Sequence, residues 1–400
     1  MIKKIFGVAI LLLLLSPAIM YLLWFFSPEK KLNVLILDKT VLESKTQEHV
    51  SLSWLLTNEK YYHNVTVPHN PKTDYFGFFP NDSGLYKIKD FNAFSNKSLD
   101  SLASSYDMAY YTDLYGIYDG EWYEKYPNVS PIKNNGIDNS MEHTERIYGG
   151  MTPSEFLLLQ KMKAQNKLII AEFNVIASPT ANNVRREFEN EFGMQWTGWV
   201  GRYYETLDTL INKELPRWLK RNYLAQHKRK WPFHKSGIVF VREDDKVEIL
   251  ENTTHLDIEL PIIQTSDNFI KKYNLPAEMK YPFWFDIVRT SSKNEIVSNY
   301  KLSPNPLGKA LLKQYGIPET FPAAIEHDSA DYKFHYFAGD FCDNPIGLKS
   351  AKFKWIEYFS IFSYQASAQE RISFFWDYYR PMMKEILSSY SKENVNHQKQ

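Results

Sequence analysis

The sequence predicts an α/β protein whose mostly parallel sheet is flanked by helices. Three segments have the length and composition of buried strands, at residues 32–37, 107–112 and 168–171. The third segment follows a helical pattern with a recognisable N-terminal cap, and each segment runs into a polar residue. Strands that alternate with helices form parallel sheets, and such sheets bind ligands at the carboxyl ends of their strands. The polar residues after these strands are therefore the first candidates for a site.

The composition excludes some classes of function. Lys plus Arg and Asp plus Glu both total 47, so the formal net charge is zero and no basic excess points to a nucleic-acid partner. Aromatic residues make up 16% of the chain, which fits a large aromatic core or, alternatively, rings that line a groove for sugars. Cys342 is the only cysteine, which excludes an intramolecular disulfide and a zinc site built on cysteines.

The N-terminus has the pattern of a membrane anchor. Lys3 and Lys4 precede an apolar run over 5–26, which is long enough to cross roughly 30 Å of hydrocarbon as a helix. Because aromatic rather than small residues end this run, we expect an uncleaved signal anchor and not a cleaved signal peptide. This expectation makes residues 1–27 a single-pass membrane helix, with the N-terminus in the cytoplasm and the body extracytoplasmic. The alternative is a buried helix of a soluble protein.

Residues 148–180 predict a turn, a helix, a buried strand and the start of a second helix. Two glycines at 149–150 suit the turn, and Thr152 is placed to cap the helix that follows. Glu155 stands three positions after Thr152, as in a capping box. The helix leads into the strand at 168–171, which makes this stretch the organising part of the predicted sheet.

Local patterns predict the remaining elements. We expect further helices at 181–191, 206–224, 304–314 and 355–388, and further strands at 237–241, 247–250, 256–263, 283–289 and 332–338. The stretch from Trp196 to Tyr204 gathers aromatic residues and Arg202 around two glycines. It predicts either a packed hinge between helices or a loop that faces a ligand, since Trp offers a flat face and Arg a fork for carboxylate or phosphate.

These patterns divide the chain into four expected segments. They are the anchor at 1–27, an α/β domain at 32–241, a β-rich extension with a late sheet strand and C-terminal helices at 242–390, and a disordered tail at 391–400.

Polar residues at the predicted strand ends form the candidate site. The catalytic candidates are Asp38, Glu172 and Asp340, and the ligand-binding candidates are Asp113, Asn174, Trp199 and Arg202. Two carboxylates that meet in a cleft can divide acid and base work. Glu172 and Asn174 are two apart on an expected strand, which predicts that their side chains share one side. The alternative is that these carboxylates are structural, with Glu172 paired to Arg202 as a buried ion pair.

The order of these parts resembles the class I glutamine amidotransferase-like fold. The likeness rests on an early strand at 32–37, the Gly-Gly turn at 149–150, a helix, and the strand at 168–171 running into a tight connection. It implies an amidotransferase- or flavodoxin-like sheet over 32–241. In that family the connection carries a cysteine nucleophile, whereas here it contains Ala171-Glu172-Phe173-Asn174. A late His-x-Glu pair is also missing, so the resemblance implies the fold and argues against glutamine hydrolysis.

Two hypotheses of function follow. The first is a membrane-anchored extracytoplasmic protein that binds or processes envelope polysaccharide, by acid/base carboxylate chemistry if it is an enzyme. The second is a catalytically inactive amidotransferase-like scaffold or interaction module at the membrane. Convergence of Glu172, Asn174, Arg202 and Asp340 in one open pocket would favour the first. The sequence has no phosphate-binding loop or dinucleotide fingerprint, and its histidines are scattered, so we expect no cofactor and no dedicated metal site.

Overall fold

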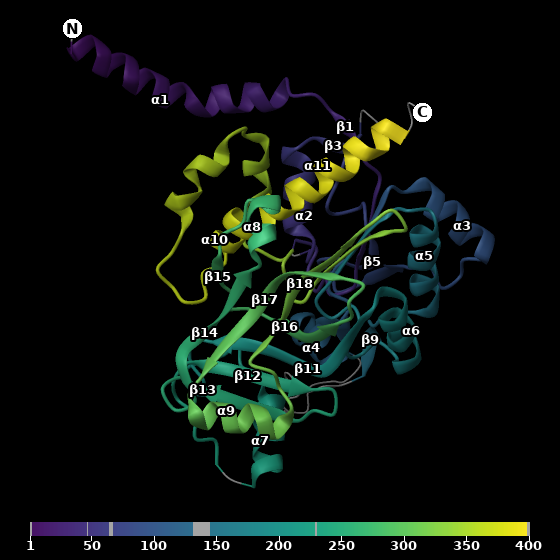
Figure 1. Cartoon of the computed structure of the whole chain (residues 1–400), viewed down its shortest axis with the longest axis vertical. Helices are drawn as coiled ribbons and strands as arrows, with labels where there is room; N and C mark the ends of the chain where they lie inside the picture. Colours follow the sequence, from purple (N-terminus) through teal and green to yellow (C-terminus); the bar gives the residue numbers. More distant parts are fainter. Residues whose placement is uncertain (1, 46, 64–66, 131–144, 229, 398–400) are drawn as a thin grey trace.

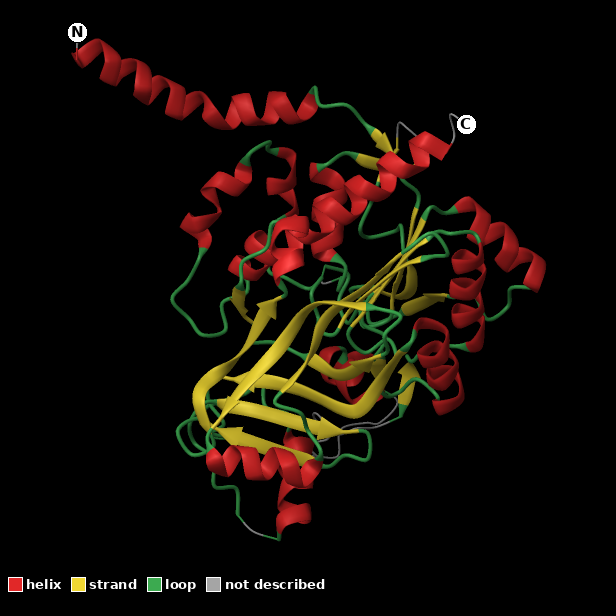
Figure 2. Ribbon diagram, viewed as in Figure 1, coloured by secondary structure: helices red, strands yellow, loops and turns green. Residues whose placement is uncertain are grey.

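A large sheet with helices on both faces forms the centre of this mixed α/β protein (Figure 1, Figure 2). The computed structural model describes residues 2–45, 47–63, 67–130, 145–228 and 230–397, with side chains for residues 14–393 of these ranges. A smaller antiparallel sheet lies below the large one in the view of Figure 2.

Five parallel strands form the middle of the ten-stranded sheet. Their order is β19 (Lys333–Phe337), β10 (Leu168–Glu172), β7 (Met108–Tyr111), β2 (Val34–Asp38) and β5 (Phe76–Pro80). Every residue of β2, β7 and β10 is buried, as expected for strands covered on both faces. The strands predicted at 32–37, 107–112 and 168–171 are therefore confirmed.

Antiparallel strands extend the sheet at both edges. One edge carries β6 (Tyr86–Lys89), and the other carries β18 (Thr320–Asp328), β17 (Glu295–Pro304), β14 (Leu256–Thr265) and β15 (Glu278–Lys280). Strands from both sides of residue 241 therefore lie in one sheet, and the division of the chain at 241/242 stays a prediction.

The smaller sheet contains the stretch that the sequence left as hinge or loop. Its order is β13 (Val247–Glu251), β12 (Gly237–Arg242), β11 (Met194–Tyr204) and β16 (Phe285–Thr290), all antiparallel. The hinge and loop interpretations of 196–204 are both wrong, because β11 is a strand with a register shift between Trp196 and Val200. Gly198 lies within that shift at φ +88, which explains a glycine inside a strand. The two sheets meet where the Asp286 N–H donates to the Ala338 carbonyl at 3.0 Å.

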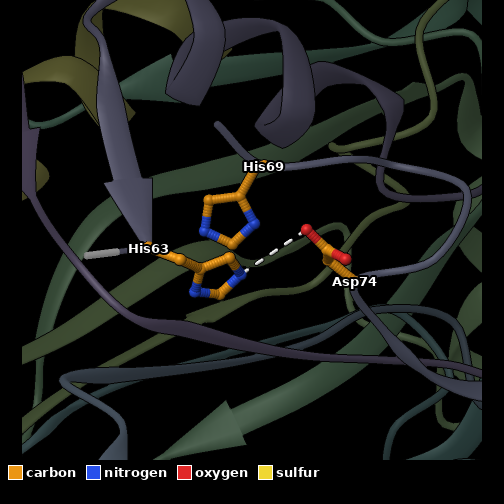
Figure 3. Close-up of side chains that lie close together, drawn as sticks. All are labelled: His63, His69 and Asp74. Atoms are coloured by element: carbon orange, nitrogen blue, oxygen red, sulfur yellow. Dashed lines mark ion pairs between the residues drawn. The ribbon is translucent and has the colours of Figure 1, made fainter. Parts of the chain in front are cut away.

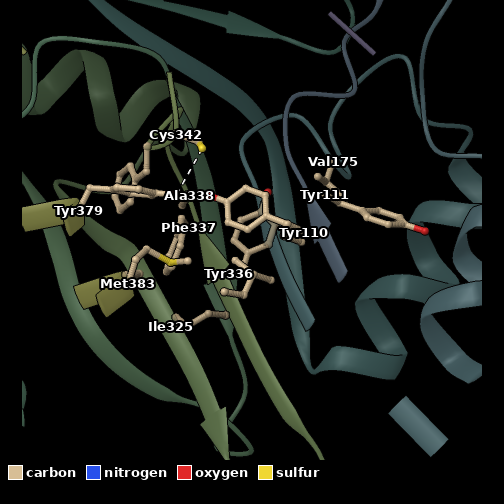
Figure 4. Close-up of a cluster of buried hydrophobic side chains, with 14 of the residues drawn as sticks. Tyr110, Tyr111, Val175, Ile325, Tyr336, Phe337, Ala338, Cys342, Tyr379 and Met383 are labelled. Carbon is tan, nitrogen blue, oxygen red and sulfur yellow. Dashed lines mark hydrogen bonds between the residues drawn. The ribbon is translucent and has the colours of Figure 1, made fainter. Parts of the chain in front are cut away.

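Two adjacent tyrosines of β7 show how the helices cover the sheet. Tyr111 points to one face, where its hydroxyl donates to the Glu155 carbonyl at 2.9 Å. Tyr110 points to the other face and meets the Tyr379 hydroxyl at 3.1 Å (Figure 4). The first face is covered by α3 (Asn96–Ser105), α5 (Pro153–Ala164) and α6 (Asn182–Phe192), and the second by α2 (Val50–Asn58), the π-helical turn η4 (Phe375–Tyr379) and α11 (Arg380–His397).

The other elements are short. They are α4 (Asp119–Lys125), α7 (Arg217–His227), α8 (Asp267–Tyr273), α9 (Pro306–Tyr315), α10 (Ile372–Phe374), the 3-10 helices η1 (Pro127–Val129), η2 (Leu348–Lys352) and η3 (Ile356–Ser363), and the strands β1 (Lys30–Lys31), β3 (Tyr61–His63), β4 (Val67–Pro68), β8 (Ile117–Tyr118) and β9 (Arg146–Tyr148). The helix predicted over 206–224 begins only at Arg217, and the one predicted over 355–388 is broken into η3, α10, η4 and α11.

The cap predicted for the organising helix is confirmed. Thr152 accepts from the Glu155 backbone N–H at 3.3 Å, and the Glu155 carboxylate accepts from the Thr152 N–H at 2.7 Å. The same carboxylate lies 2.8 Å from Lys39 Nζ, and both side chains are fully buried. This ion pair links the end of β2 to the start of α5.

The membrane anchor expected at 5–26 is corrected by the structure. The segment is a helix, α1 (Ile2–Phe25), but within the described residues no helix has the length and apolar composition needed to cross a membrane. The end of α1 packs on the protein: Trp24 is buried, and its indole N–H donates to the Thr57 carbonyl at 3.0 Å. The predicted single-pass anchor, with its cytoplasmic-to-extracytoplasmic orientation, is therefore wrong, whereas a contact of residues 5–26 with a membrane surface stays untested.

The expected disordered tail at 391–400 is helical in its first part. Helix α11 continues to His397, and residues 398–400 lie outside the described residues.

Candidate functional site at the carboxyl edge of the sheet

Parallel strands bring four of the predicted carboxylates to one edge of the large sheet. Asp38 ends β2 and Glu172 ends β10, while Asp113 and Asp340 follow β7 and β19 closely. These residues have different surroundings, which decide what each can do.

Asp38 organises the start of α2. Its Oδ2 atom lies 2.7 Å from His49 Nδ1 and accepts the Glu48 backbone N–H at 3.0 Å. The other ring nitrogen of His49 lies 2.9 Å from the Pro71 carbonyl. Asp38 and His49 are fully buried, so this pair holds Glu48 in place and does not itself face a ligand.

Glu172 is enclosed by hydroxyl groups. Thr112 donates to one carboxylate oxygen at 2.6 Å and Tyr110 to the other at 2.8 Å, and the side chain has no exposed area. Burial raises the pKa of Glu172 to about 8, although these two hydrogen bonds oppose the rise. The suggested ion pair with Arg202 is not formed, since Arg202 pairs with Glu214 at 2.7 Å.

Asp340 belongs to a cluster of three carboxylates, Glu48, Asp340 and Asp343, which we call the acidic cluster. One oxygen from each lies within 4.8 Å of the others. Asp340 is 4% exposed, and its Oδ1 atom has no hydrogen-bond partner among the described residues. Burial and then the Asp343 charge raise the pKa of Asp340 well above its usual value, and burial and the same charge raise that of Glu48. The cluster can therefore hold a proton or bind a positively charged or hydroxylated group.

Asp113 and Asn174 lie beside this cluster but in a hydrogen-bonded turn. The Asn174 side chain bonds to Asp113, and its backbone N–H donates to Asp286 Oδ2 at 3.2 Å. Burial raises the pKa of Asp113 to about 7 and that of Asp286 to about 7. Strand β10 ends at Glu172, and Asn174 beyond it has φ +62. The expectation that Glu172 and Asn174 lie on one extended strand, with their side chains on the same side, is therefore wrong.

An aromatic and cationic rim borders the acidic cluster. The Trp284 carbonyl accepts the Asp340 N–H at 3.2 Å, and Phe283 and Trp284 are partly exposed. The Arg371 guanidinium lies 3.4 Å from the Phe283 ring centroid, and its Nη1 atom is 3.4 Å from Asp343 Oδ2. The rim offers a flat apolar face and a fork of N–H donors next to carboxylates.

The two remaining predicted ligand-binding residues lie on β11. Arg202 reaches the outer part of the rim, 5.0 Å from the Phe283 centroid and 5.5 Å from that of Trp284. Trp199 is buried in the smaller sheet, where Arg242 and Tyr315 pack against its ring. The structure therefore brings Asp340 and Arg202 to the same rim and places Trp199 away from it.

Sequence reasoning missed Glu48, Asp343, Arg371 and the Phe283–Trp284 rim. Glu48 stands ten residues beyond Asp38, and Asp343 three beyond Asp340, so closeness to the predicted strand ends was a usable signal for these two. Nothing in the sequence marks Arg371, which reaches the site from before α10. The oxygen-only acidic cluster suits hard cations such as Ca²⁺ or Mg²⁺. A second group of possible metal ligands, His63, His69 and Asp74, lies elsewhere, contrary to the expectation of scattered histidines.

Cys342 lies close to this edge, but its surroundings do not make the thiol reactive. It is fully buried, where its sulfur accepts from the Leu52 N–H at 3.3 Å and from the Tyr379 hydroxyl at 3.3 Å (Figure 4). Burial, and then the neighbouring Glu172, raise the pKa of the thiol well above its usual value. A reactive cysteine needs the opposite environment, one that favours the thiolate.

Comparisons with known proteins give only distant likenesses. No family model and no curated protein matches the chain. A ThuA-like protein from Parabacteroides merdae is 11% identical, with 78% of this chain and 79% of that chain covered and a TM-score of 0.32. The cytoplasmic protein STM1381 from Salmonella typhimurium LT2 is 10% identical, with 90% and 99% covered and a TM-score of 0.35. The carbohydrate deacetylase Agd3 is 10% identical, with 78% and 29% covered and a TM-score of 0.30. These scores are too low to carry conclusions about fold or function.

Proposed function

We propose that the chain binds and processes a carbohydrate at the acidic cluster and its aromatic rim. The observation that carries this proposal is the convergence of Glu48, Asp340 and Asp343 within 4.8 Å of one another, where the Asp340 N–H donates to the backbone carbonyl of Trp284. Carboxylates accept hydrogen bonds from sugar hydroxyls, and an indole face packs on the apolar face of a sugar ring.

The cluster has the features needed for proton transfer. Three carboxyl groups this close do not all ionise together, so at least one retains a proton near neutral pH. Asp340, whose pKa is raised by burial and then by the Asp343 charge, is the proposed general acid. Asp343, with 37% of its side chain exposed, is the proposed base. Arg371 positions Asp343, and Asp38 positions Glu48.

A catalytically inactive amidotransferase-like scaffold is the second candidate. It is favoured by the complete burial of Glu172 and by the absence of a cysteine at 171–174. In this function the strand-end carboxylates are structural, and neither glycan binding nor turnover depends on the acidic cluster.

A glycan panel distinguishes the two functions. The full chain is titrated with soluble oligosaccharides of neutral hexoses, N-acetylhexosamines and uronic acids, and products are analysed by mass spectrometry. We expect wild-type turnover of one class and a loss of about 100-fold or more in Asp340→Asn, a magnitude typical of general acids. The matched control Asp257→Asn, on an exposed position of β14, is expected to behave as wild type, as is Cys342→Ser.

Equal binding and turnover by wild type and Asp340→Asn would contradict the proposed site. Binding without turnover of any glycan would remove the catalytic half of the proposal and leave a binding protein. Neither binding nor turnover across the panel would favour the scaffold.

A further inference from the structure

Two histidines and an aspartate lie together outside the carboxyl edge (Figure 3). His63 ends β3, His69 directly follows β4, and Asp74 lies in the loop before β5. One nitrogen from each imidazole and one carboxylate oxygen are all within 4.8 Å of one another. His63 Nε2 is 3.7 Å from Asp74 Oδ2, and the two imidazole centroids are 3.8 Å apart.

We propose that His63, His69 and Asp74 form a binding site for a transition-metal ion of the Zn²⁺ class. Two imidazole nitrogens and one carboxylate are a donor set that such ions prefer, and three protein ligands leave a position for water. The side chains of His63 and Asp74 are 22% and 28% exposed, so an ion can enter from solvent. The oxygen-only acidic cluster suits a different class of ion.

His69 gives independent support, because one nitrogen of its buried ring is available for coordination. The residue is 8% exposed, and its Nε2 atom is buried without a hydrogen-bond partner among the described residues. The ring makes its hydrogen bond to the backbone of Leu32 instead. Coordination by Nε2 would satisfy an atom that is otherwise costly to bury.

Asp74 is oriented by its own loop. Its Oδ2 atom accepts the Asn70 backbone N–H at 2.8 Å, and its Oδ1 atom accepts the Thr73 hydroxyl at 2.8 Å. Hydrogen bonds of this kind fix the direction of a coordinating carboxylate, as the Leu32 contact does for His69. Zinc ligands stand about 2 Å from the ion and so roughly 3.4 Å from each other. Small rotations of the partly exposed His63 side chain would close the remaining distance.

One charge opposes the site. The positive charge of Lys89 acts on both His63 and Asp74, and it attracts the Asp74 carboxylate. Its ammonium lies 4.2 Å from the Phe76 ring centroid, and the residue is exposed, so it is free to turn toward solvent when a cation binds. Removal of this charge is expected to tighten metal binding.

A bound ion would also act on the carboxyl edge through the loop at 69–74. The Pro71 carbonyl in this loop contacts His49, whose other nitrogen contacts Asp38. Fixing His69 and Asp74 to His63 would therefore hold the loop that supports the start of α2. Because an ion that binds only the folded state stabilises it, the ion should raise the melting temperature.

Zinc titration of the metal-free full chain tests the proposal. Zn²⁺ binding is measured by competition with a chromophoric chelator, and Co²⁺ spectra report nitrogen ligation. We expect one ion per chain and binding about tenfold weaker or more in His63→Gln and in Asp74→Asn. Lys89→Gln is expected to bind more tightly. The control His234→Gln removes an imidazole with 70% exposed side-chain area and should have no effect.

His63→Gln is the deciding variant, because its side chain is near the surface and its loss leaves the buried His69 intact. Unchanged Zn²⁺ affinity in His63→Gln overturns the proposal, as does absence of binding by the wild type. Loss of the site in Asp343→Asn would assign the ion to the acidic cluster and would also overturn it. Failure of glycan turnover leaves this proposal standing, since the two sites share no residue.

Discussion

Glu172 is a carboxylic acid whose surroundings favour its protonated form. Burial raises its pKa to about 8, despite hydrogen bonds from Thr112 and Tyr110. The folded chain therefore holds this proton more tightly than the unfolded chain does. Its contribution to stability is complete below the usual carboxyl pKa and is lost as the pH rises through about 8.

The Glu172→Gln variant isolates this contribution, because a neutral amide of similar volume does not titrate. We expect the variant to become more stable relative to the wild type as the pH rises from 5 to 9, as measured by the free energy of unfolding. Each unit of pKa displacement is worth about 1.4 kcal/mol, so the total change is a few kcal/mol. Urea unfolding at pH 5, 7 and 9 measures it. A difference that stays constant with pH would show that Glu172 does not titrate in this way.

Thr152 is an element-scale feature, since it decides where α5 begins. Its capping box includes Glu155, which also holds the buried Lys39 beside the end of β2. Loss of the cap therefore disturbs both the helix start and the support of the strand. Sequence spacing was sufficient to predict this element because a cap is a local arrangement within four residues.

Thr152→Ala is expected to lower the free energy of unfolding by about 1–2 kcal/mol, the upper part of the range for N-caps. The matched control is Ser95→Ala at the exposed start of α3, where the Ser95 hydroxyl accepts the Ser98 N–H at 3.1 Å without a capping box. We expect a loss of about 0.5–1 kcal/mol there. Denaturant unfolding compares the two. An equal or larger loss in Ser95→Ala would mean that the Glu155 network adds nothing to the cap.

Strand β11 shows why another element was not predictable. Two glycines among aromatic residues suggested a hinge or a loop, but each glycine has a reason that lies in a partner strand. Gly198 occupies the register shift against β16, and a Cβ atom at Gly201 would lie 2.4 Å from the Phe285 ring. A long-range close approach leaves no local pattern in the sequence.

At the scale of the whole molecule, the tendency of parallel sheets to bind ligands at the carboxyl ends of their strands located the candidate site. It did not identify all the residues of that site. Asp38, Asp113, Glu172 and Asp340 were predictable because parallel strands end at one edge. The sequence did not show which of these carboxylates are enclosed and which are accessible, since this depends on Tyr110 and Thr112 at the end of β7 and on the distant Tyr379. Arg371 and Trp284 come to the edge from distant segments, and only the assembled fold brings them together.

The location of a bound sugar tests the central claim most directly. Crystals of the full chain are soaked with the oligosaccharide that binds most tightly in the glycan panel. We expect a sugar ring packed on Trp284, with hydroxyls within hydrogen-bond distance of Asp343 and Glu48, and no such density in crystals of Asp343→Asn. A sugar bound away from the acidic cluster, or the same density at the rim in Asp343→Asn, would contradict the claim.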